Sequence, residues 1–225
     1  MSLPYNQLDN SMHVNQLGKS SANRKFYCIV KRLTDIFGAL VAIFLFTPVM
    51  ATIAVLIKLE NPGGTVFYKQ IRVGQHNKRF VMYKFRSMVC NADELFEQLR
   101  AQSDVQGKMF KMKDDPRLTN IGKIIRKTSL DELPQLLNVL VGDMSLVGPR
   151  PPLEREVQEY NSIELLRLSV KPGCTGLWQV SARNTVGFKE MLEMDFEYIS
   201  KSSWWYDMIL ILRTFPAMFG RKGAF

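Results

Sequence analysis

A long uncharged stretch at residues 36–57 constrains the fold of this 225-residue chain more than any other feature. As a straight helix it would be about 33 Å long, which is enough to cross the hydrocarbon core of a bilayer. A buried helix of a soluble protein fits less well, because none of its faces is polar. We therefore expect a membrane helix within an anchor segment that covers residues 24–60.

Two features of the anchor favour a helix that enters the membrane and returns on the same side. Thr47 and Pro48 lie near its middle, where proline removes a backbone donor and bends or breaks the helix. The Thr47 hydroxyl could pair with a carbonyl freed there. Basic residues flank both ends, although positive charge normally gathers on one side. They are Arg24, Lys25, Lys31 and Arg32 before the stretch, and Lys58, Lys69, Arg72, Lys78 and Arg79 after it. We expect a re-entrant helix with both ends in the cytoplasm; a simple crossing is the alternative.

The segments on either side of the anchor differ in character. Residues 1–23 are rich in Asn, Gln and Ser and are expected to form a flexible leader. Residues 61–225 are expected to form one folded domain. The formal net charge of +9 favours an anionic partner, such as a phosphorylated substrate, an anionic membrane face or nucleic acid. Nucleic acid is the weakest of these, because the basic residues do not gather in a recognisable motif.

Few residues are suited to redox, thiolate or imidazole chemistry. Cys28, Cys90 and Cys174 are widely spaced, which suggests neither a disulfide framework nor a thiolate metal site. His13 lies in the leader, and His76 lies in a turn-like sequence where a solvent-exposed side chain is expected. His76 is thus the sole imidazole candidate for acid-base or metal chemistry, and an ordinary loop histidine is the favoured interpretation.

The folded domain is expected to be α+β and mostly helical. Two short strands at residues 65–71 and 79–85 should pair as a hairpin. Apolar spacing predicts helices over residues 93–102 and around 121–127. Residues 203–213 begin with aromatic residues and continue with aliphatic ones, a pattern typical of an amphipathic helix at a membrane interface. A C-terminal helix packed on the core is an equal alternative.

The most informative part of the domain contains the adjacent carboxylates Asp131 and Glu132. Taken alone, the sequence from Ser129 to Glu132 matches a helix capping box. Its surroundings favour another role, because basic residues precede it and a glycine- and proline-rich block follows. In that block Arg150 has a proline on each side, which restricts its backbone and favours a preorganised phosphate contact. An exposed polyproline-like linker is the alternative for this block.

Several motifs in one order carry a resemblance to a known family. They are KFRSM at residues 84–88, SLDELPQ at 129–135, GDMS at 142–145, GPRP at 148–151, KPGCTGLWQV at 171–180 and RN at 183–184. On these motifs and the Thr47-Pro48 pair, the chain resembles the bacterial sugar transferase family, the monotopic phosphoglycosyl transferases, from about residue 26 to 223.

The resemblance implies a specific reaction and setting. It implies a UDP-sugar donor, undecaprenyl phosphate as acceptor, magnesium as cofactor, and a cytoplasm-facing site on a re-entrant anchor in the inner membrane. In members of the family an aspartate attacks the sugar-linked phosphorus and releases UMP, and the matching residue is Asp131. Glu132 corresponds to the magnesium-binding partner. The reaction would be the first membrane step of surface polysaccharide or glycan synthesis.

The chemistry of the residues agrees with this reading. Aspartate is ionised near neutral pH and can attack without a dedicated base. Neighbouring helical positions point about 100° apart, so Asp131 and Glu132 can share a substrate only along a helix edge or at its N-terminus. Arg150 is the expected phosphate clamp. Further cationic candidates around the donor or lipid phosphate are Lys84, Arg86, Arg126 and Arg183.

Two other functions remain open from the sequence. A magnesium-dependent phosphohydrolase would use water in place of the lipid phosphate. A non-catalytic basic module at the membrane surface would explain the charge and the anchor, but not the paired carboxylates. The sequence does not identify the sugar, and it leaves the assembly open, with a homo-oligomer among the options.

Overall fold

The computed structural model describes residues 21–99, 112, 115–181 and 186–219. Helices dominate this part of the chain and short strands form two pairs, which confirms the expected α+β, mostly helical fold. Residues 1–20 of the predicted leader lie outside the described residues. The α-helices and strands are α2 (Ser21–Glu60), β1 (Phe67–Val73), β2 (Arg79–Phe85), α3 (Ala92–Leu99), α4 (Asn120–Lys127), α5 (Gln135–Val141), β3 (Ser145–Val147), α6 (Glu154–Gln158), β4 (Gly173–Thr175), α7 (Leu177–Ser181), α8 (Phe188–Lys201) and α9 (Trp204–Phe219). Short 3-10 helices are η2 (Gln75–Asn77), η4 (Leu130–Glu132) and η5 (Glu164–Ser169).

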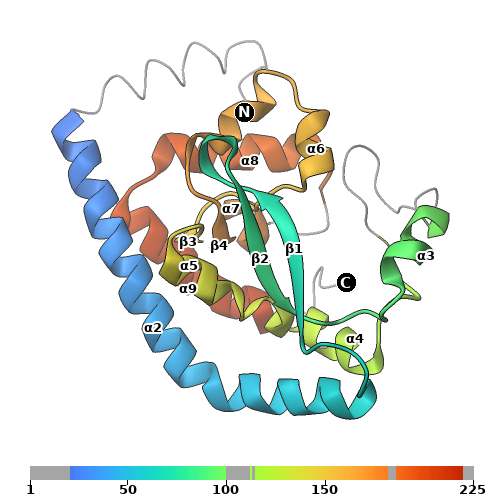
Figure 1. The fold of residues 1–225 in the computed structure, drawn as a ribbon. Helices are drawn as coiled ribbons and strands as arrows, with labels where there is room; N and C mark the ends of the chain where they lie inside the picture. The colour runs from blue at the N-terminus through green and yellow to red at the C-terminus, as the bar shows by residue number, and fades with distance from the viewer. Residues whose placement is uncertain (1–20, 100–111, 113–114, 182–185, 220–225) are drawn as a thin grey trace.

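The apolar stretch lies within α2, which is one helix that bends (Figure 1). The helix continues through Pro48, so the expected break at Thr47 and Pro48 is not an interruption of the helix. Proline removes only one N–H donor, the partner of the Phe44 carbonyl, and a long helix can bend there without ending. The Thr47 hydroxyl donates to the carbonyl of Ile43 at 2.6 Å. The threonine therefore pairs with the carbonyl next to the one that Pro48 frees.

Both ends of α2 are bound to the same folded body. Near its start, Arg32 donates to the carbonyls of Val139 and Leu140 at 2.6 and 2.8 Å, at the C-terminal end of α5. At its end, the carboxylate of Glu60 accepts the backbone N–H groups of Asn120 and residue 121, at the start of α4. The bend of α2 thus lies between two parts of the helix that both contact the folded domain.

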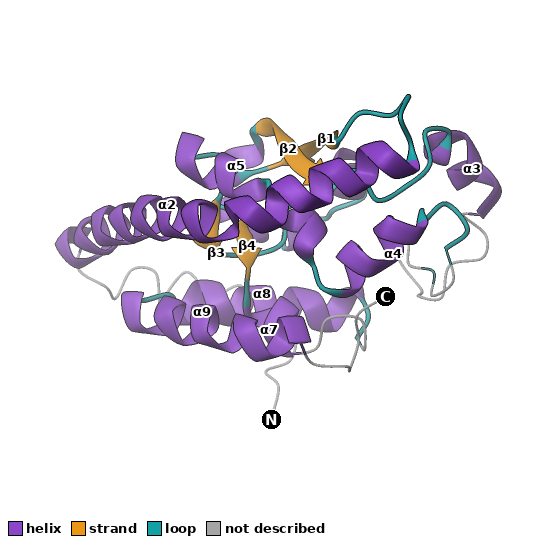
Figure 2. Cartoon of the chain, turned by 90° about the horizontal axis from the view of Figure 1, so that it is seen from below, coloured by secondary structure: helices purple, strands orange, loops and turns teal. Residues whose placement is uncertain are grey.

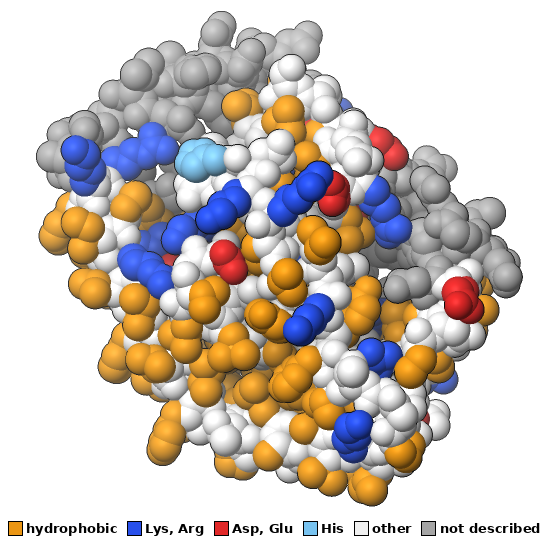
Figure 3. Space-filling view, viewed as in Figure 1, with side chains coloured by type: hydrophobic (Ala, Val, Ile, Leu, Met, Phe, Trp, Pro, Cys, Tyr) orange, Lys and Arg blue, Asp and Glu red, His pale blue; other side chains and the backbone are white. Residues whose placement is uncertain are grey.

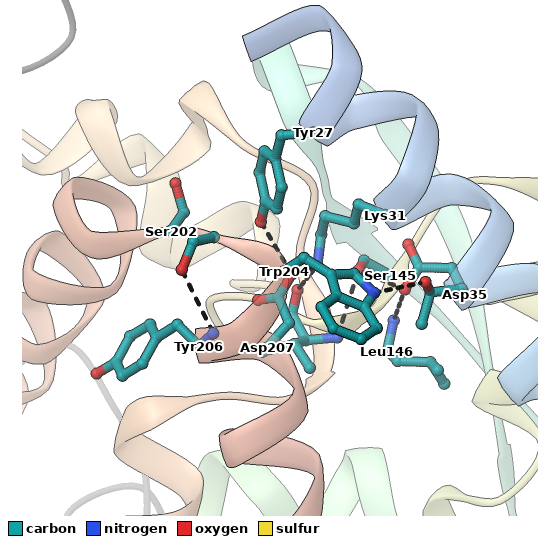
Figure 4. Close-up of polar contacts among 12 residues, drawn as sticks. Tyr27, Lys31, Asp35, Ser145, Leu146, Ser202, Trp204, Tyr206 and Asp207 are labelled. Carbon is teal, nitrogen blue, oxygen red and sulfur yellow. Dashed lines mark hydrogen bonds and ion pairs between the residues drawn. The ribbon is translucent and has the colours of Figure 1, made fainter. Parts of the chain in front are cut away.

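A buried polar cluster fixes the N-terminal part of α2, around Lys31 and Asp35, against α9 and β3 (Figure 4). Lys31 Nζ lies 2.8 Å from a carboxylate oxygen of Asp207 and donates to the carbonyl of Val147 at 3.0 Å. Asp35 accepts hydrogen bonds from the Ser145 hydroxyl and from the next backbone N–H, each at 2.9 Å. These groups satisfy one another's hydrogen bonds where the helix meets the domain.

Strands β1 and β2 form the predicted antiparallel hairpin. The first strand begins and ends two residues later than expected, and the second has the expected bounds. His76 lies in the η2 turn with a φ of 55° and an exposed side chain, which confirms the expected turn histidine. Alternation places Tyr68, Gln70 and Arg72 on the inward face of β1, so the hairpin presents polar side chains to the interior.

The remaining elements form two layers with the short parallel pair β3–β4 between them (Figure 2). Helices α7, α8 and α9 lie on one side, and α2, α5 and the hairpin lie on the other. Gly148 and Gly173 allow a very close approach of the chain around this pair, since a Cβ on Gly173 would lie 2.0 Å from the backbone nitrogen of Gly148. Their loops run from this pair to the cavity described below.

Hydrophobic side chains are exposed along α2 and over the lower part of the molecule (Figure 3). Phe37 is 70% and Phe44 is 80% exposed. Among the described residues, Arg24–Glu60 is the one helix long and apolar enough to cross a membrane. Helix α9 packs on the core through the fully buried Leu210, as one of the two alternatives predicts, and exposes Leu212, which is 68% accessible. The membrane-interface alternative stays a prediction.

Candidate active site

A cavity of about 1390 Å³ lies between the hairpin, η4, α2, α7 and α9. One part of it is polar and lined by the carboxylates and arginines described below. The other part is apolar, and its lining includes Phe37, Val41 and Leu45 of α2 with Met208 and Ile211 of α9. The cavity therefore joins a charged region to a groove beside the apolar helix.

Asp131 lies on η4 and faces the polar part of the cavity. Ser129, just before η4, has a left-handed φ of 57°, which reverses the chain after α4. Leu130 then packs against the core cluster around Phe85. The side chain of Ser129 makes no capping hydrogen bond, so the capping box suggested by the sequence does not form. The turn instead leaves Asp131 5% exposed at the cavity wall.

Glu132 lies beside Asp131 and is paired with Lys84 of β2. The distance from Lys84 Nζ to Glu132 Oε1 is 2.5 Å, and the side chain of Glu132 is 39% exposed. Both carboxylates line the same cavity. The 3-10 turn therefore resolves the expected geometric difficulty, because both residues reach one space from its edge.

The two carboxylates differ in acidity. Burial, together with the negative charge of Glu132, raises the pKa of Asp131 to about 6, although Lys84 and Arg126 oppose that rise. Burial also raises the pKa of Glu132, but Lys84 and the more distant Arg150 outweigh it and hold that pKa below its usual range. Both groups are therefore mainly ionised at neutral pH.

Arg150 is half-buried at the cavity wall, in the loop between β3 and α6. Its guanidinium carbon lies 5.8 Å from the centre of the Trp178 ring. A cation held over an aromatic face is partly oriented before any ligand binds. The predicted phosphate clamp thus lies in the same cavity as the carboxylates.

The other predicted cations have different surroundings. Arg126 donates to the Ser87 hydroxyl at 3.0 Å, and Arg86 donates to the carbonyl and hydroxyl of Thr65 at 2.8 and 2.6 Å. Both line the cavity with Lys84. Arg183 lies outside the described residues. The structure therefore gathers four of the five predicted substrate-binding residues around one space.

The residues present fit a magnesium ion only with help from a substrate. Within the described part of the chain, no group of three His, Cys, Asp or Glu side chains could hold a metal ion. Magnesium commonly uses one or two carboxylates and completes its octahedron with phosphate oxygens and water. The half-exposed carboxylate of Glu132 suits that arrangement, in competition with Lys84.

Sequence reasoning missed two features of the cavity wall. Arg72 is 4% exposed on the inward face of β1, where the period of two could have revealed it. Burial, and then the positive charge of Arg150, lower its pKa to about 9. Trp178 stands in the sequence only as part of the motif at residues 171–180. Arg72 and Trp178 both lie next to Arg150. The local sequence does not predict this proximity, because it arises from tertiary contacts.

Comparison with known proteins identifies the family of the chain. The family described as Bacterial sugar transferase matches residues 26–221. Galactosyl transferase CpsE of Streptococcus agalactiae serotype III is 45% identical over 205 residues, which cover 89% of this chain and 45% of that protein. Undecaprenyl-phosphate galactose phosphotransferase of Salmonella typhimurium is 42% identical over 215 residues, covering 94% of this chain and 44% of that protein.

A third relative is matched over nearly its whole length. The exopolysaccharide production protein ExoY of Rhizobium meliloti is 38% identical over 211 residues, covering 92% of this chain and 93% of that protein. The chain thus spans less than half of the first two relatives and most of the third. The chain belongs to the bacterial sugar transferase family.

Proposed function

We propose that the chain transfers a sugar 1-phosphate from a UDP-sugar to undecaprenyl phosphate and releases UMP. The observation that carries this proposal is the buried Asp131 in a cation-lined cavity that continues into an apolar groove. A soluble nucleotide sugar suits the charged part, and a lipid phosphate suits the junction with the groove. The relatives' names, which include UDP-galactose-lipid carrier transferase, support this pairing of substrates.

The proposed reaction has two displacements at one phosphorus. A carboxylate oxygen of Asp131 attacks the sugar-linked phosphorus, the bond to the bridging oxygen breaks, and UMP leaves with that electron pair. A phosphate oxygen of the lipid then attacks the same phosphorus and displaces the Asp131 carboxylate. With a pKa of about 6, Asp131 is mainly ionised at neutral pH and needs no separate base.

The cations around Asp131 offset the charge of the donor. Arg150 is placed to bind donor phosphate oxygens, and Arg126 or Lys84 to bind the remaining oxygens. Glu132 is the residue that we expect to hold magnesium, which would reduce the repulsion between the carboxylate and the phosphates. Lys84 keeps the Glu132 carboxylate ionised and close to Asp131.

The anchor is proposed to be re-entrant, with the catalytic domain on the cytoplasmic face of the inner membrane. Arg32 and Glu60, near the two ends of α2, both contact the same domain, which supports a helix that returns to the side it entered. The exposed face of α9 would lie at the membrane surface. The lipid tail would follow the groove between α2 and α9 to reach Asp131.

Release of UMP tests the function. The purified chain in a lipid nanodisc is offered UDP-galactose and other UDP-sugars with magnesium, with and without undecaprenyl phosphate. We expect multiple turnovers only with the lipid, and formation of a lipid-linked sugar diphosphate. Multiple turnovers without the lipid, with free sugar phosphate as product, would instead identify a phosphohydrolase.

A further inference from the structure

The backbone around Arg150 is held by two buried guanidinium groups. Arg167, which is 3% exposed, donates from Nη2 to the carbonyl of Arg150 at 3.0 Å. Arg72, which is 4% exposed, donates from Nη1 to the carbonyl of Pro151 at 2.9 Å. Two consecutive carbonyls therefore accept hydrogen bonds from arginines in separate elements, η5 and β1. Carbonyls bound to cationic donors hold the peptide planes on both sides of residue 151.

Each of these arginines is itself fixed by a partner. Arg167 Nη2 lies 2.6 Å from a carboxylate oxygen of Asp195 on α8, and Arg167 Nη1 donates to the Tyr160 hydroxyl at 2.7 Å. Arg72 donates from Nε and Nη2 to the amide oxygen of Gln70 at 3.1 and 2.7 Å. The two arginines therefore connect the backbone of residues 150 and 151 to α8 on one side and to the hairpin on the other.

The carbonyls on either side of residues 150 and 151 also accept hydrogen bonds. The backbone N–H of Val73 donates to the carbonyl of Pro152 at 3.1 Å, and that of Gly173 donates to the carbonyl of Pro149 at 2.9 Å. The Arg150 side chain lines the cavity and lies against the Trp178 ring. Prolines on both sides of Arg150 limit the conformations of this loop further.

Stability alone is a weak reason for burying such groups. Removing a guanidinium and a carboxylate from water costs several kcal/mol per ion, and apolar residues of similar volume often stabilise a core as well or better. The orientation of a bound anion, in contrast, requires donors held in place before the ligand arrives. The placement of these charges behind Arg150 thus matches a positioning role.

We propose that Arg72 and the Arg167–Asp195 pair are positioning residues that hold the Arg150 backbone so that its guanidinium meets the donor phosphate. This inference rests on the proposed function, in which Arg150 contacts the UDP-sugar. The three residues act through Arg150, so they should affect donor binding and leave the lipid acceptor unaffected. Their loss should also have no further effect once the Arg150 side chain is absent.

The test compares Arg167→Lys, Arg72→Lys and Arg150→Ala in the full chain, each alone, with each lysine variant also combined with Arg150→Ala. We expect each lysine variant to raise the KM for UDP-sugar about tenfold, because a point charge cannot reproduce the guanidinium contacts. The KM for undecaprenyl phosphate should change less than about twofold. In the Arg150→Ala background the lysine substitutions should raise the donor KM no further.

Asp207→Asn provides a matched control, because it weakens another buried ion pair, with Lys31. It should lower thermal stability and leave the donor KM unchanged. Folded lysine variants with an unchanged donor KM would overturn the inference, as would effects fully additive to Arg150→Ala. If one of the two lysine variants does not fold, the donor KM of the other variant tests the inference. An unchanged donor KM in Arg150→Ala would contradict the contact between Arg150 and the donor phosphate, and with it the inference. Lack of lipid-dependent UMP release by the unaltered chain would instead contradict the proposed function itself.

Discussion

Lys84 Nζ lies 2.5 Å from Glu132 Oε1, so the lysine of the hairpin binds the carboxylate next to Asp131 and not Asp131 itself. This ion pair helps to give the two carboxylates different pKa values. Glu132 is held in its charged form, while the buried Asp131 carries a raised pKa. The lysine thus controls the acidity of both groups from one position.

Replacing Lys84 should change the titration of Asp131. Lys84 lowers the pKa of Asp131, so Lys84→Met should raise that pKa above its value of about 6. Carbon-detected NMR of labelled aspartate in metal-free protein would follow the titration. Lys69→Met provides a control on the exposed side of the same hairpin and should leave it unchanged. An unaltered Asp131 titration in Lys84→Met would contradict the assigned electrostatics.

Asp131→Asn should stabilise the fold at neutral pH. The folded-state pKa of Asp131 is raised, so its protonated form contributes stability that is present below about pH 4 and is lost as the pH rises through about 6. Replacing it should therefore gain stability at pH 8 relative to pH 4, by up to roughly 3 kcal/mol for a shift of this size. Chemical denaturation at both pH values measures the difference. A gain that does not depend on pH would contradict the raised pKa.

Much of this site was foreseeable from local sequence, and the rest was not. The hairpin, the mostly helical fold and the α4 region follow from residue periodicity, which depends on near neighbours. Asp131 is singled out by the motifs around it, whereas its local sequence alone predicts a capping box. That box does not form, since Ser129 adopts a left-handed conformation and Glu132 turns to Lys84. Contacts such as Arg72 with Pro151 join distant segments, and no local pattern encodes them.

The bend of α2 predicts a specific pattern of accessibility. In a chain without its native cysteines, single cysteines at residues 28 and 59 should both react with a membrane-impermeant reagent from the cytoplasmic side. Both positions are exposed in the structure. Phe44→Cys, near the bend, should be protected by lipid although its side chain is 80% exposed in the protein. Labelling of residues 28 and 59 from opposite sides would contradict the re-entrant arrangement.

A bulky residue in the apolar groove should interfere with the acceptor alone. Val41 lines the groove and is 40% exposed, so Val41→Trp can fill space there without overpacking the core. We expect the KM for undecaprenyl phosphate to rise about tenfold, of the order of the loss of one to two buried methylene groups. The donor KM should not change. Phe44→Trp, on an outward face of the same helix, is the control, and equal effects of the two substitutions would argue against the groove.

Asp131 is proposed to carry the sugar phosphate during transfer. The most direct test of this role is mass spectrometry of the protein after incubation with UDP-sugar and magnesium in the absence of lipid, with UMP measured in the same sample. We expect one sugar phosphate per active chain, located on Asp131, with an equal amount of UMP and with neither in Asp131→Asn. A sugar phosphate on another residue, or lipid-dependent turnover by a clean preparation of Asp131→Asn, would contradict the account.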